Sequence, residues 1–192
     1  SLVVETPSPA LDAYLNGWAI YQTLACRLLG RCSLYQSGGA YGFRDQLQDI
    51  CALIDFEPEL ARKHILLSAA HQYEEGDVMH WWHPGQEGDK GVRTRCSDDL
   101  LWLPYACTLY VQKTGDEGLW EEKAPWLCSP ELRNNERDRY ETPQSIGEGT
   151  IREHCLRVFR QLEKRGTGPH GLPLMGAGDW NDGFDRVEGE SV

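Results

Sequence analysis

The amino-acid sequence predicts an all-α fold, and three observations support this. Several segments carry apolar residues at helical spacing, long polar loops containing glycine separate them, and no segment shows a convincing strand alternation. Helices joined in this way suggest an α/α toroid or a helix bundle, in which functional residues gather in the loops at one end. The 192 residues are about enough for one domain with a sizeable core.

The first helix is predicted to begin after Ser8, which can cap it, and to end at Gly30. Pro9 suits the first turn because its fixed φ matches the helix and its missing N–H has no partner there. The apolar residues that recur at helical spacing are Leu11, Tyr14, Leu15, Trp18, Ala25, Leu28 and Leu29.

The second and third helices follow a glycine-rich stretch at residues 37–42. The second begins after Phe43-Arg44-Asp45-Gln46 and has one apolar face. That face consists of Leu47, Ile50, Cys51 and Ile54. The third begins at Pro58 and extends to Tyr73.

Two further helices are predicted in the second half of the chain. One has an acidic start at residues 97–99, where carboxylates favour the positive end of the helix dipole, and runs to about Lys113. The last spans Thr150 to Arg165, and Gly166 stops it. Residues 76–96 and 121–148 are expected to be loop-like or irregular, because they show little periodicity.

Charge and cysteine content narrow the class of protein. The net charge of −11 argues against binding nucleic acid or anionic lipid. The seven cysteines form no C-x-x-C pair, which indicates buried thiols in a reducing cytosol rather than a disulfide framework or a zinc site.

The ends of the chain suggest a fragment of a longer polypeptide. No run approaches the roughly 20 apolar residues of a membrane span, and the N-terminus lacks the features of a signal peptide, so we expect a cytoplasmic protein without membrane insertion. The chain does not begin with Met, and its last residues carry no terminating feature.

The segment at residues 176–183 is rich in groups suited to sugar chemistry. It places Asp179, Trp180, Asn181 and Asp182 among glycines, which let a ligand approach the backbone closely. Glycosidic-bond chemistry needs an acid for the leaving oxygen and an apolar face for the sugar ring. Spacing alone does not choose between Asp179 and Asp182 as the acid, and a plain turn at the Asp-Gly dipeptide is the alternative interpretation.

A second cluster lies about a hundred residues earlier, in His80-Trp81-Trp82-His83-Pro84 and in residues 91–99. Its charged members fit a sugar site, because carboxylates and guanidinium groups hydrogen-bond ring hydroxyls in pairs. They are Arg93, Arg95, Asp98 and Asp99. For the two acids, a capped helix with a surface ion pair is the alternative.

Two smaller patterns complete the candidate site. The pair Arg44-Asp45 follows a glycine-rich approach that favours a pocket. His80 and His83 lack a third ligand at a diagnostic spacing, so no metal is expected. Together these clusters indicate a carbohydrate-active enzyme.

Five strings spread over nearly the whole chain resemble family 94 of the glycoside hydrolases, which includes cellobiose, chitobiose and β-1,2-oligoglucan phosphorylases and the C-terminal module of cyclic β-1,2-glucan synthases. The strings are Gly42-Phe43-Arg44-Asp45-Gln46-Leu47-Gln48-Asp49, Glu75-Gly76-Asp77-Val78-Met79-His80-Trp81-Trp82-His83-Pro84, Gly91-Val92-Arg93-Thr94-Arg95, Ser97-Asp98-Asp99-Leu100-Leu101-Trp102-Leu103-Pro104 and Gly178-Asp179-Trp180-Asn181-Asp182-Gly183. The Trp-Trp-His-Pro form is most similar to the β-1,2-glucan branch.

This resemblance implies a partial (α/α)6 barrel, with residues 1–192 as about its N-terminal half and long loops carrying the site. It also implies inverting phosphorolysis of a β-glucoside, in which Asp182 is the general acid and Trp180, Arg93 and Asp99 hold the terminal glucose. The remaining substrate-binding candidates are Arg44, Asp45, Asp179, Trp82 and His83.

Phosphate is the expected co-substrate, no cofactor is expected, and a homodimer of the full-length protein is compatible with the resemblance. A phosphate dianion is already a nucleophile, so the reaction needs no second carboxylate to activate water. The general acid must stay protonated near neutral pH, so we expect a raised pKa for Asp182. The groups that hold phosphate are expected outside this chain.

Two alternatives stay open from the sequence. A hydrolase on the same toroid would use water and would need a base, for which Glu148 is a candidate. A non-catalytic carbohydrate-binding module of a cyclic β-1,2-glucan synthase would bind sugar without turnover. Phosphate dependence separates the first alternative from a phosphorylase.

Overall fold

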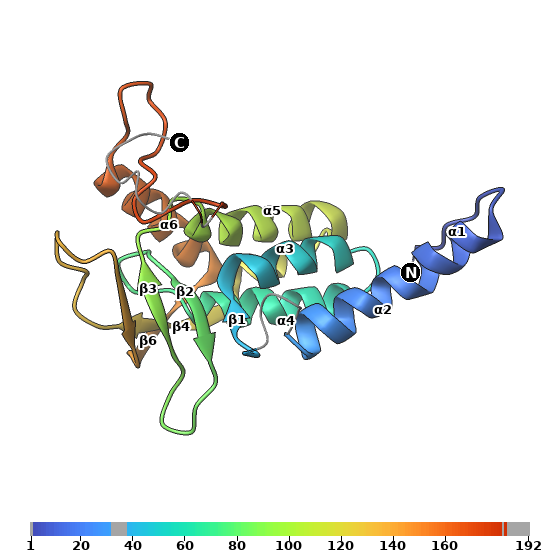
Figure 1. The fold of residues 1–192 in the computed structure, drawn as a ribbon, viewed down its shortest axis with the longest axis horizontal. Helices are drawn as coiled ribbons and strands as arrows, with labels where there is room; N and C mark the ends of the chain where they lie inside the picture. Colours follow the sequence, from blue (N-terminus) through green and yellow to red (C-terminus); the bar gives the residue numbers. More distant parts are fainter. Residues whose placement is uncertain (1, 32–37, 182, 184–192) are drawn as a thin grey trace.

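The computed structural model describes residues 2–31, 38–181 and 183, and within them helices pack against antiparallel β-sheets (Figure 1). The prediction of an all-α fold, half of an (α/α)6 barrel, is therefore wrong. Strands occupy parts of both segments that the sequence analysis expects to be irregular, residues 76–96 and 121–148.

The described strands form a four-stranded and a two-stranded sheet, both antiparallel. The strands of the larger sheet, in order, are β1 (Tyr41–Gly42), β2 (Met79–His83), β3 (Lys90–Thr94) and β5 (Asp138–Glu141). The smaller sheet pairs β4 (Lys123–Cys128) with β6 (Gln144–Thr150).

Strand β3 lacks the usual alternation because neither of its buried residues carries an apolar side chain. In β3 the residues that turn inward are Gly91 and Arg93, while Val92 is only half-buried. Gly91 is required there, since a Cβ on it would lie 2.1 Å from the carbonyl oxygen of Trp81. A pattern of apolar residues at every second position therefore does not mark this strand.

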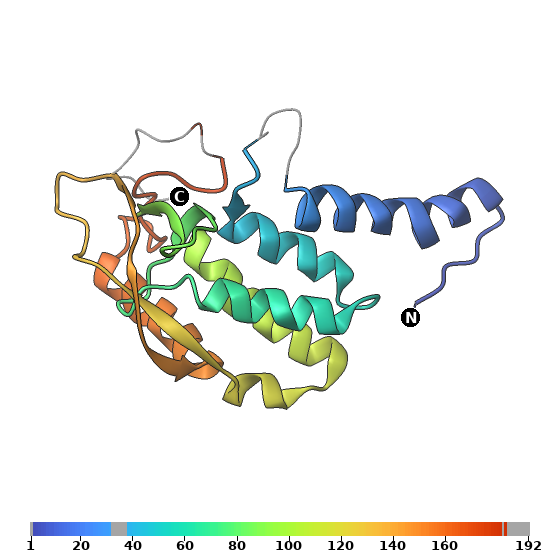
Figure 2. The same ribbon diagram turned by 90° about the horizontal axis from the view of Figure 1, so that it is seen from below.

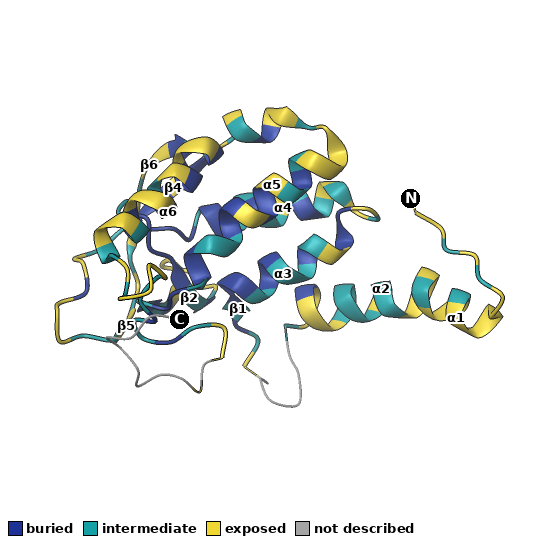
Figure 3. Cartoon of the chain, turned by 90° about the horizontal axis from the view of Figure 1, so that it is seen from above, coloured by how far each residue is buried: buried dark blue, intermediate teal, exposed yellow. Residues whose placement is uncertain are grey.

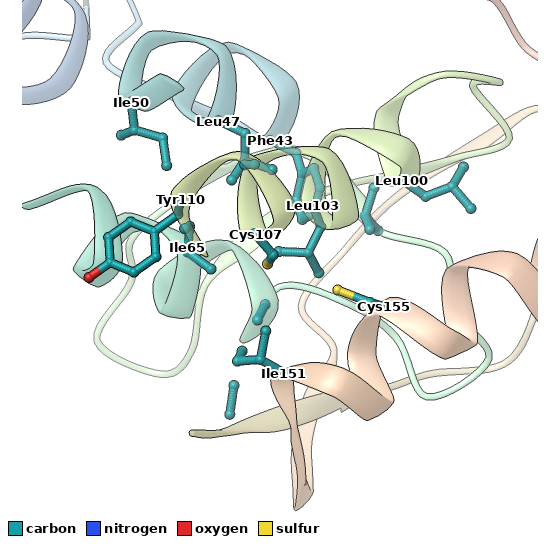
Figure 4. Close-up of a cluster of buried hydrophobic side chains, with 14 of the residues drawn as sticks. Phe43, Leu47, Ile50, Ile65, Leu100, Leu103, Cys107, Tyr110, Ile151 and Cys155 are labelled. Atoms are coloured by element: carbon teal, nitrogen blue, oxygen red, sulfur yellow. The ribbon is translucent and has the colours of Figure 1, made fainter. Parts of the chain in front are cut away.

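The core lies between three helices that pack side by side, α3 (Phe43–Leu53), α4 (Pro58–Ala69) and α5 (Trp102–Thr114) (Figure 2). The 3₁₀ turn Asp99–Leu101 leads into α5, and the 3₁₀ turn Glu117–Glu121 follows it. Helix α6 (Ile151–Arg165) packs against the same core (Figure 4). The central buried side chains include Phe43, Leu47, Ile50, Ile65, Leu103, Tyr110, Ile151 and Cys155.

Helix α6 begins and ends where the sequence predicts. The side-chain oxygen of Thr150 accepts from the backbone N–H of Glu153, and the Glu153 carboxylate accepts from the backbone N–H of Thr150. This capping box satisfies two N–H groups that would otherwise have no partner at the helix start. Gly166 ends the helix with φ of 80°, a conformation that favours glycine.

The N-terminal helix extends away from the rest of the chain (Figures 1 and 2). It consists of α1 (Pro9–Ala13), the π-helical turn Tyr14–Trp18, α2 (Ala19–Gln22) and the π-helical turn Thr23–Leu29. Much of this helix is coloured as exposed in Figure 3. Its exposed aromatic side chains are Tyr14, Trp18 and Tyr21. No helix in the described part of the chain is long and apolar enough to cross a membrane.

Candidate active site

The two sequence clusters meet where the C-terminal loop lies against the end of the β2–β3 hairpin. The backbone N–H of Ser97 donates to the carbonyl of Gly178 (2.8 Å), and that of Ala177 donates to the carbonyl of Arg95 (3.3 Å). Gly176 makes this approach possible, because its φ is 63° and a Cβ would lie 2.1 Å from the Arg95 carbonyl oxygen. The loop before Asp179 is therefore fixed next to Asp98 and Asp99.

Asp99 is the best-buried carboxylate of the site, with 1% of its surface exposed. Its Oδ2 lies 2.6 Å from Nδ1 of His80. Its Oδ1 is buried and accepts no hydrogen bond from the described residues, although Nη1 of Arg44 lies 3.7 Å away. Buried acceptors are almost always paired, so this oxygen is suited to accept from a hydroxyl group of a ligand.

Arg44, at the start of α3, connects the two acidic segments. Its Nη1 donates to Oδ1 of Asp98 (3.1 Å) and to the carbonyl of Asp179 (2.8 Å). Nε1 of Trp102 donates to the other carboxylate oxygen of Asp98 (3.1 Å). Burial and the neighbouring charge of Asp99 raise the pKa of Asp98, while Arg44 acts in the opposite direction.

A cavity of about 320 Å³ lies beside this cluster. Residues from β2, β3, the start of β5 and the neighbouring loops form its wall. The lining residues are His80, Trp81, Val92, Thr94, Cys96, Arg137, Asp138 and Ala177. The cavity therefore combines an indole with a charged and polar wall, which suits a saccharide ring and its hydroxyls.

A bulge in β2 brings His80 and Trp81 to the same cavity. Met79 pairs with Arg93 and Trp81 pairs with Val92, so two steps along β2 match one step along β3. A bulge of this kind re-aims side chains, and bulges are common beside active sites. Without it, strict alternation would place His80 and Trp81 on opposite faces.

The same cluster contains the described residues best placed to hold a metal. One ligand atom each of His80, Cys96 and Asp99 lies within 4.8 Å of the others. His80 is already hydrogen-bonded to Asp99, and Sγ of Cys96 lies 3.6 Å from the carbonyl of Asp179, to which it donates. The expectation that the site needs no metal stays a prediction.

Arg93 lies outside this cluster. Its side chain is completely buried, and its guanidinium pairs with Glu75 and Asp77 at 3.0 Å each and stacks over the ring of Tyr73. Its Nη1 also donates to the carbonyl of Ser129 at 3.2 Å. These contacts hold β3 in the fold, and contact with sugar stays a prediction for this residue.

Trp82 and His83 are also placed apart from the cavity wall. Trp82 is 1% exposed and stacks on His71 (3.8 Å between ring centroids) and on Tyr41 (5.4 Å). His83, at the end of β2, has Nε2 2.9 Å from the carbonyl of Gly38. Asp45 is half-exposed and pairs with Arg27 at 3.6 Å.

The C-terminal loop presents Trp180 at the surface, 64% exposed. Asp179 contributes its carbonyl to Arg44, and its Oδ1 accepts from the backbone N–H of Asn181 (2.8 Å). Asp182, the predicted general acid, lies outside the described residues.

Sequence reasoning missed several residues of the cavity wall. Trp81 stood in the recognised motif, but Trp82 was preferred, and the bulge that decides between them leaves no sign in the sequence. Arg137 and Asp138 stood in a segment interpreted as irregular, with no pattern to mark them.

The family model and the curated relatives that match this chain indicate the same family. The sequence model of the Glycosyl hydrolase 94 superfamily, catalytic domain, matches residues 1–192. The chain is 47% identical to the cyclic beta-(1,2)-glucan synthase NdvB of Rhizobium meliloti (strain 1021), over 98% of this chain and 7% of the synthase. It is 31% identical to the solabiose phosphorylase of Paenibacillus borealis, over 100% of this chain and 22% of that protein.

A third relative is the N,N'-diacetylchitobiose phosphorylase of Vibrio proteolyticus, 27% identical over 98% of this chain and 24% of that protein. The chain thus spans less than a quarter of the length of these relatives.

Proposed function

We infer the function of this chain from its family, because the chain belongs to the glycosyl hydrolase 94 superfamily. We propose that it forms part of the catalytic domain of a β-glucoside phosphorylase or of a related glucan synthase. The main support for this proposal is the arrangement of residues around Asp99. Asp99 is a buried carboxylate with one oxygen that accepts no hydrogen bond from the described residues, and it lies beside a cavity that contains an indole and polar groups. The loop toward Asp182 is hydrogen-bonded to the same segment.

In the proposed reaction, phosphate attacks the anomeric carbon of a terminal β-glucosyl unit. The bond from that carbon to the glycosidic oxygen breaks, Asp182 gives its proton to the leaving oxygen, and α-glucose 1-phosphate is released with inversion. Asp99 and His80 hold sugar hydroxyls, and Arg44 fixes the loop that carries Asp179 and Trp180.

Phosphorolysis of β-1,2-linked glucan is the finer proposal. The 47% identity to a cyclic beta-(1,2)-glucan synthase, against 31% to a solabiose phosphorylase, supports this linkage. The same identity favours one alternative, a saccharide-binding module of a synthase that does not itself turn over substrate. The hydrolase alternative has less support, because Glu148 lies on β6 in an exposed ion pair with Lys123 at 3.0 Å.

The proposal is tested by assaying the full-length polypeptide with glucose oligosaccharides. It should be incubated with β-1,2-, β-1,3- and β-1,4-linked substrates, with and without inorganic phosphate, and α-glucose 1-phosphate should be measured. We expect phosphate-dependent release from the β-1,2-linked substrates. Free glucose formed without phosphate would indicate a hydrolase, and binding without any product would indicate a non-catalytic module.

Trp81, rather than Trp82, is expected to support the sugar ring. Replacing Trp81 with Ala should raise KM about three- to tenfold, which corresponds to the loss of one aromatic contact of about 0.5–1.5 kcal/mol. Steady-state kinetics and thermal denaturation should be measured together. In contrast, Trp82→Ala should lower stability, because its side chain is buried in the core. An unchanged KM for Trp81→Ala would exclude this role.

A further inference from the structure

A second cavity, of about 420 Å³, adjoins the cavity of the candidate active site. Three arginines from separate parts of the chain reach it: Arg95 follows β3, Arg137 precedes β5 and Arg165 ends α6. The full described lining is Arg95, Asn134, Asn135, Glu136, Arg137, Arg165, Leu174, Gly176 and Ala177.

The charge of this wall is opposite to that of the protein. The chain carries a net charge of −11, yet the described lining has three guanidinium groups and a single carboxylate, Glu136. That carboxylate is already engaged, because it pairs with Arg139 and accepts from the backbone N–H of Arg133 (2.8 Å). The cavity is therefore a positively charged site in an acidic protein.

The hydrogen bonds that Arg165 and Arg95 donate within the described part of the chain go to neutral groups. Nη1 of Arg165 donates to the carbonyl of Cys96 at 2.9 Å, while its Nε is buried and has no hydrogen-bond partner among the described residues. Nη2 of Arg95 donates to the carbonyls of Leu132 (2.7 Å) and Arg133 (2.8 Å). Burial lowers the pKa of Arg165, while the carboxylates of Asp77 and Asp99 act in the opposite direction.

We propose that this three-arginine cavity binds the phosphate group of a small anion, either inorganic phosphate or a sugar phosphate. A buried guanidinium nitrogen without an acceptor, such as Nε of Arg165, is costly, and a tetrahedral oxyanion supplies both an acceptor and a compensating charge. The planar fork of arginine matches phosphate oxygens in pairs, and about 420 Å³ is enough for a monosaccharide phosphate.

This inference goes beyond the proposed function, because it concerns a second cavity and needs no turnover. The two cavities share Arg137 and Ala177 in their walls, so they adjoin each other. Phosphate bound in the second cavity would contact the backbone at Gly176 and Ala177 that leads to Asp179, without being the attacking nucleophile.

The test is a binding measurement on the full-length protein, by titration calorimetry at constant ionic strength with inorganic phosphate, α-glucose 1-phosphate, glucose or chloride. Arg165→Gln is expected to weaken phosphate binding at this cavity about 10- to 100-fold, since one charge-assisted contact is removed. Arg160→Gln is the matched control, because it lies on the same helix with an exposed side chain, and it should bind as the parent does.

A second measurement locates the bound ion and does not depend on the Arg165→Gln variant folding. Phenylglyoxal modifies accessible guanidinium groups, and peptide mass spectrometry reports each arginine separately. Phosphate or α-glucose 1-phosphate should slow modification of Arg95 and Arg165 at least several-fold and leave Arg160 unchanged. The ligand that protects at the lower concentration identifies the source of the phosphate group.

Equal protection of these residues by chloride and phosphate would overturn the inference, as would phosphate binding that is unchanged in Arg165→Gln. The outcome is separate from that of the proposed function. A protein that lacks phosphorolysis but shows phosphate protection of Arg95 and Arg165 contradicts only the proposed function, whereas an active phosphorylase without such protection contradicts only this inference.

Discussion

Replacing Asp182 with Asn should reduce kcat of the full-length protein about 10²- to 10⁴-fold, the usual contribution of a general acid. The amide keeps the size of the side chain but cannot protonate the leaving glycosidic oxygen. Binding of the oligosaccharide should be retained, because in the proposed site the sugar is held by other groups such as Asp99. Turnover should be measured as phosphate-dependent release of α-glucose 1-phosphate, and binding by calorimetry with the same substrate.

Asp179→Asn is the matched control for this substitution. Asp179 lies three residues earlier in the same loop, and its described contacts are a carbonyl that accepts from Arg44 and a carboxylate that accepts from the backbone N–H of Asn181. The amide can still accept at that position, so we expect a much smaller loss of kcat. Normal turnover of Asp182→Asn together with a large loss in Asp179→Asn would assign the general acid to Asp179 instead.

The helices could be predicted because their signals are local. Thr150 and Glu153 form a capping box, Gly166 adopts a positive φ at the end of α6, and Pro58 lies in the first turn of α4. Each of these signals acts within a few residues, so the sequence alone reveals it. The apolar face of α3 also predicted this helix, but its start was placed after Gln46, whereas the helix begins at Phe43.

The strands could not be predicted because their stability comes from long-range contacts. Arg93 takes an inward position of β3 that an apolar residue would normally occupy, and it is accepted there because Glu75 and Asp77 neutralise it. The residues next to Arg93 in the sequence do not indicate these partners, because Glu75 and Asp77 lie 18 and 16 residues away. The same reasoning explains β5, whose residues 138–141 are mostly charged and pair with β3 across more than forty positions of sequence.

The candidate site was predicted in outline but not in detail. Motif strings indicated that Arg44, Asp99 and the loop around Asp179 belong together, and the structure brings them within hydrogen-bonding or ion-pair distance. The sequence could not predict which of the two neighbouring tryptophans lines the cavity. That depends on a bulge that shifts Trp81 toward the cavity and leaves Trp82 in the core.

The family resemblance implies that Arg93 binds sugar, whereas its buried ion pairs indicate a structural role. Replacing Arg93 distinguishes these two roles. Arg93→Met should lower the free energy of unfolding by about 3–5 kcal/mol, because it leaves two carboxylates without their cation at a site where the arginine is fully buried. Unfolding in urea should be followed by circular dichroism and fluorescence, on the same full-length preparation used for kinetics.

The control is Arg27→Met, which breaks the Arg27–Asp49 pair (3.0 Å) on a half-exposed surface and should cost about 0–1 kcal/mol. A large loss of stability in Arg93→Met alone would establish that this guanidinium holds β3 against the segment of Glu75 and Asp77. If Arg93→Met instead kept its stability and raised KM for the oligosaccharide many-fold, the arginine would be a sugar ligand. In that case β3 would have to present its other face to the substrate, and the cavity beside Trp81 would lose its role.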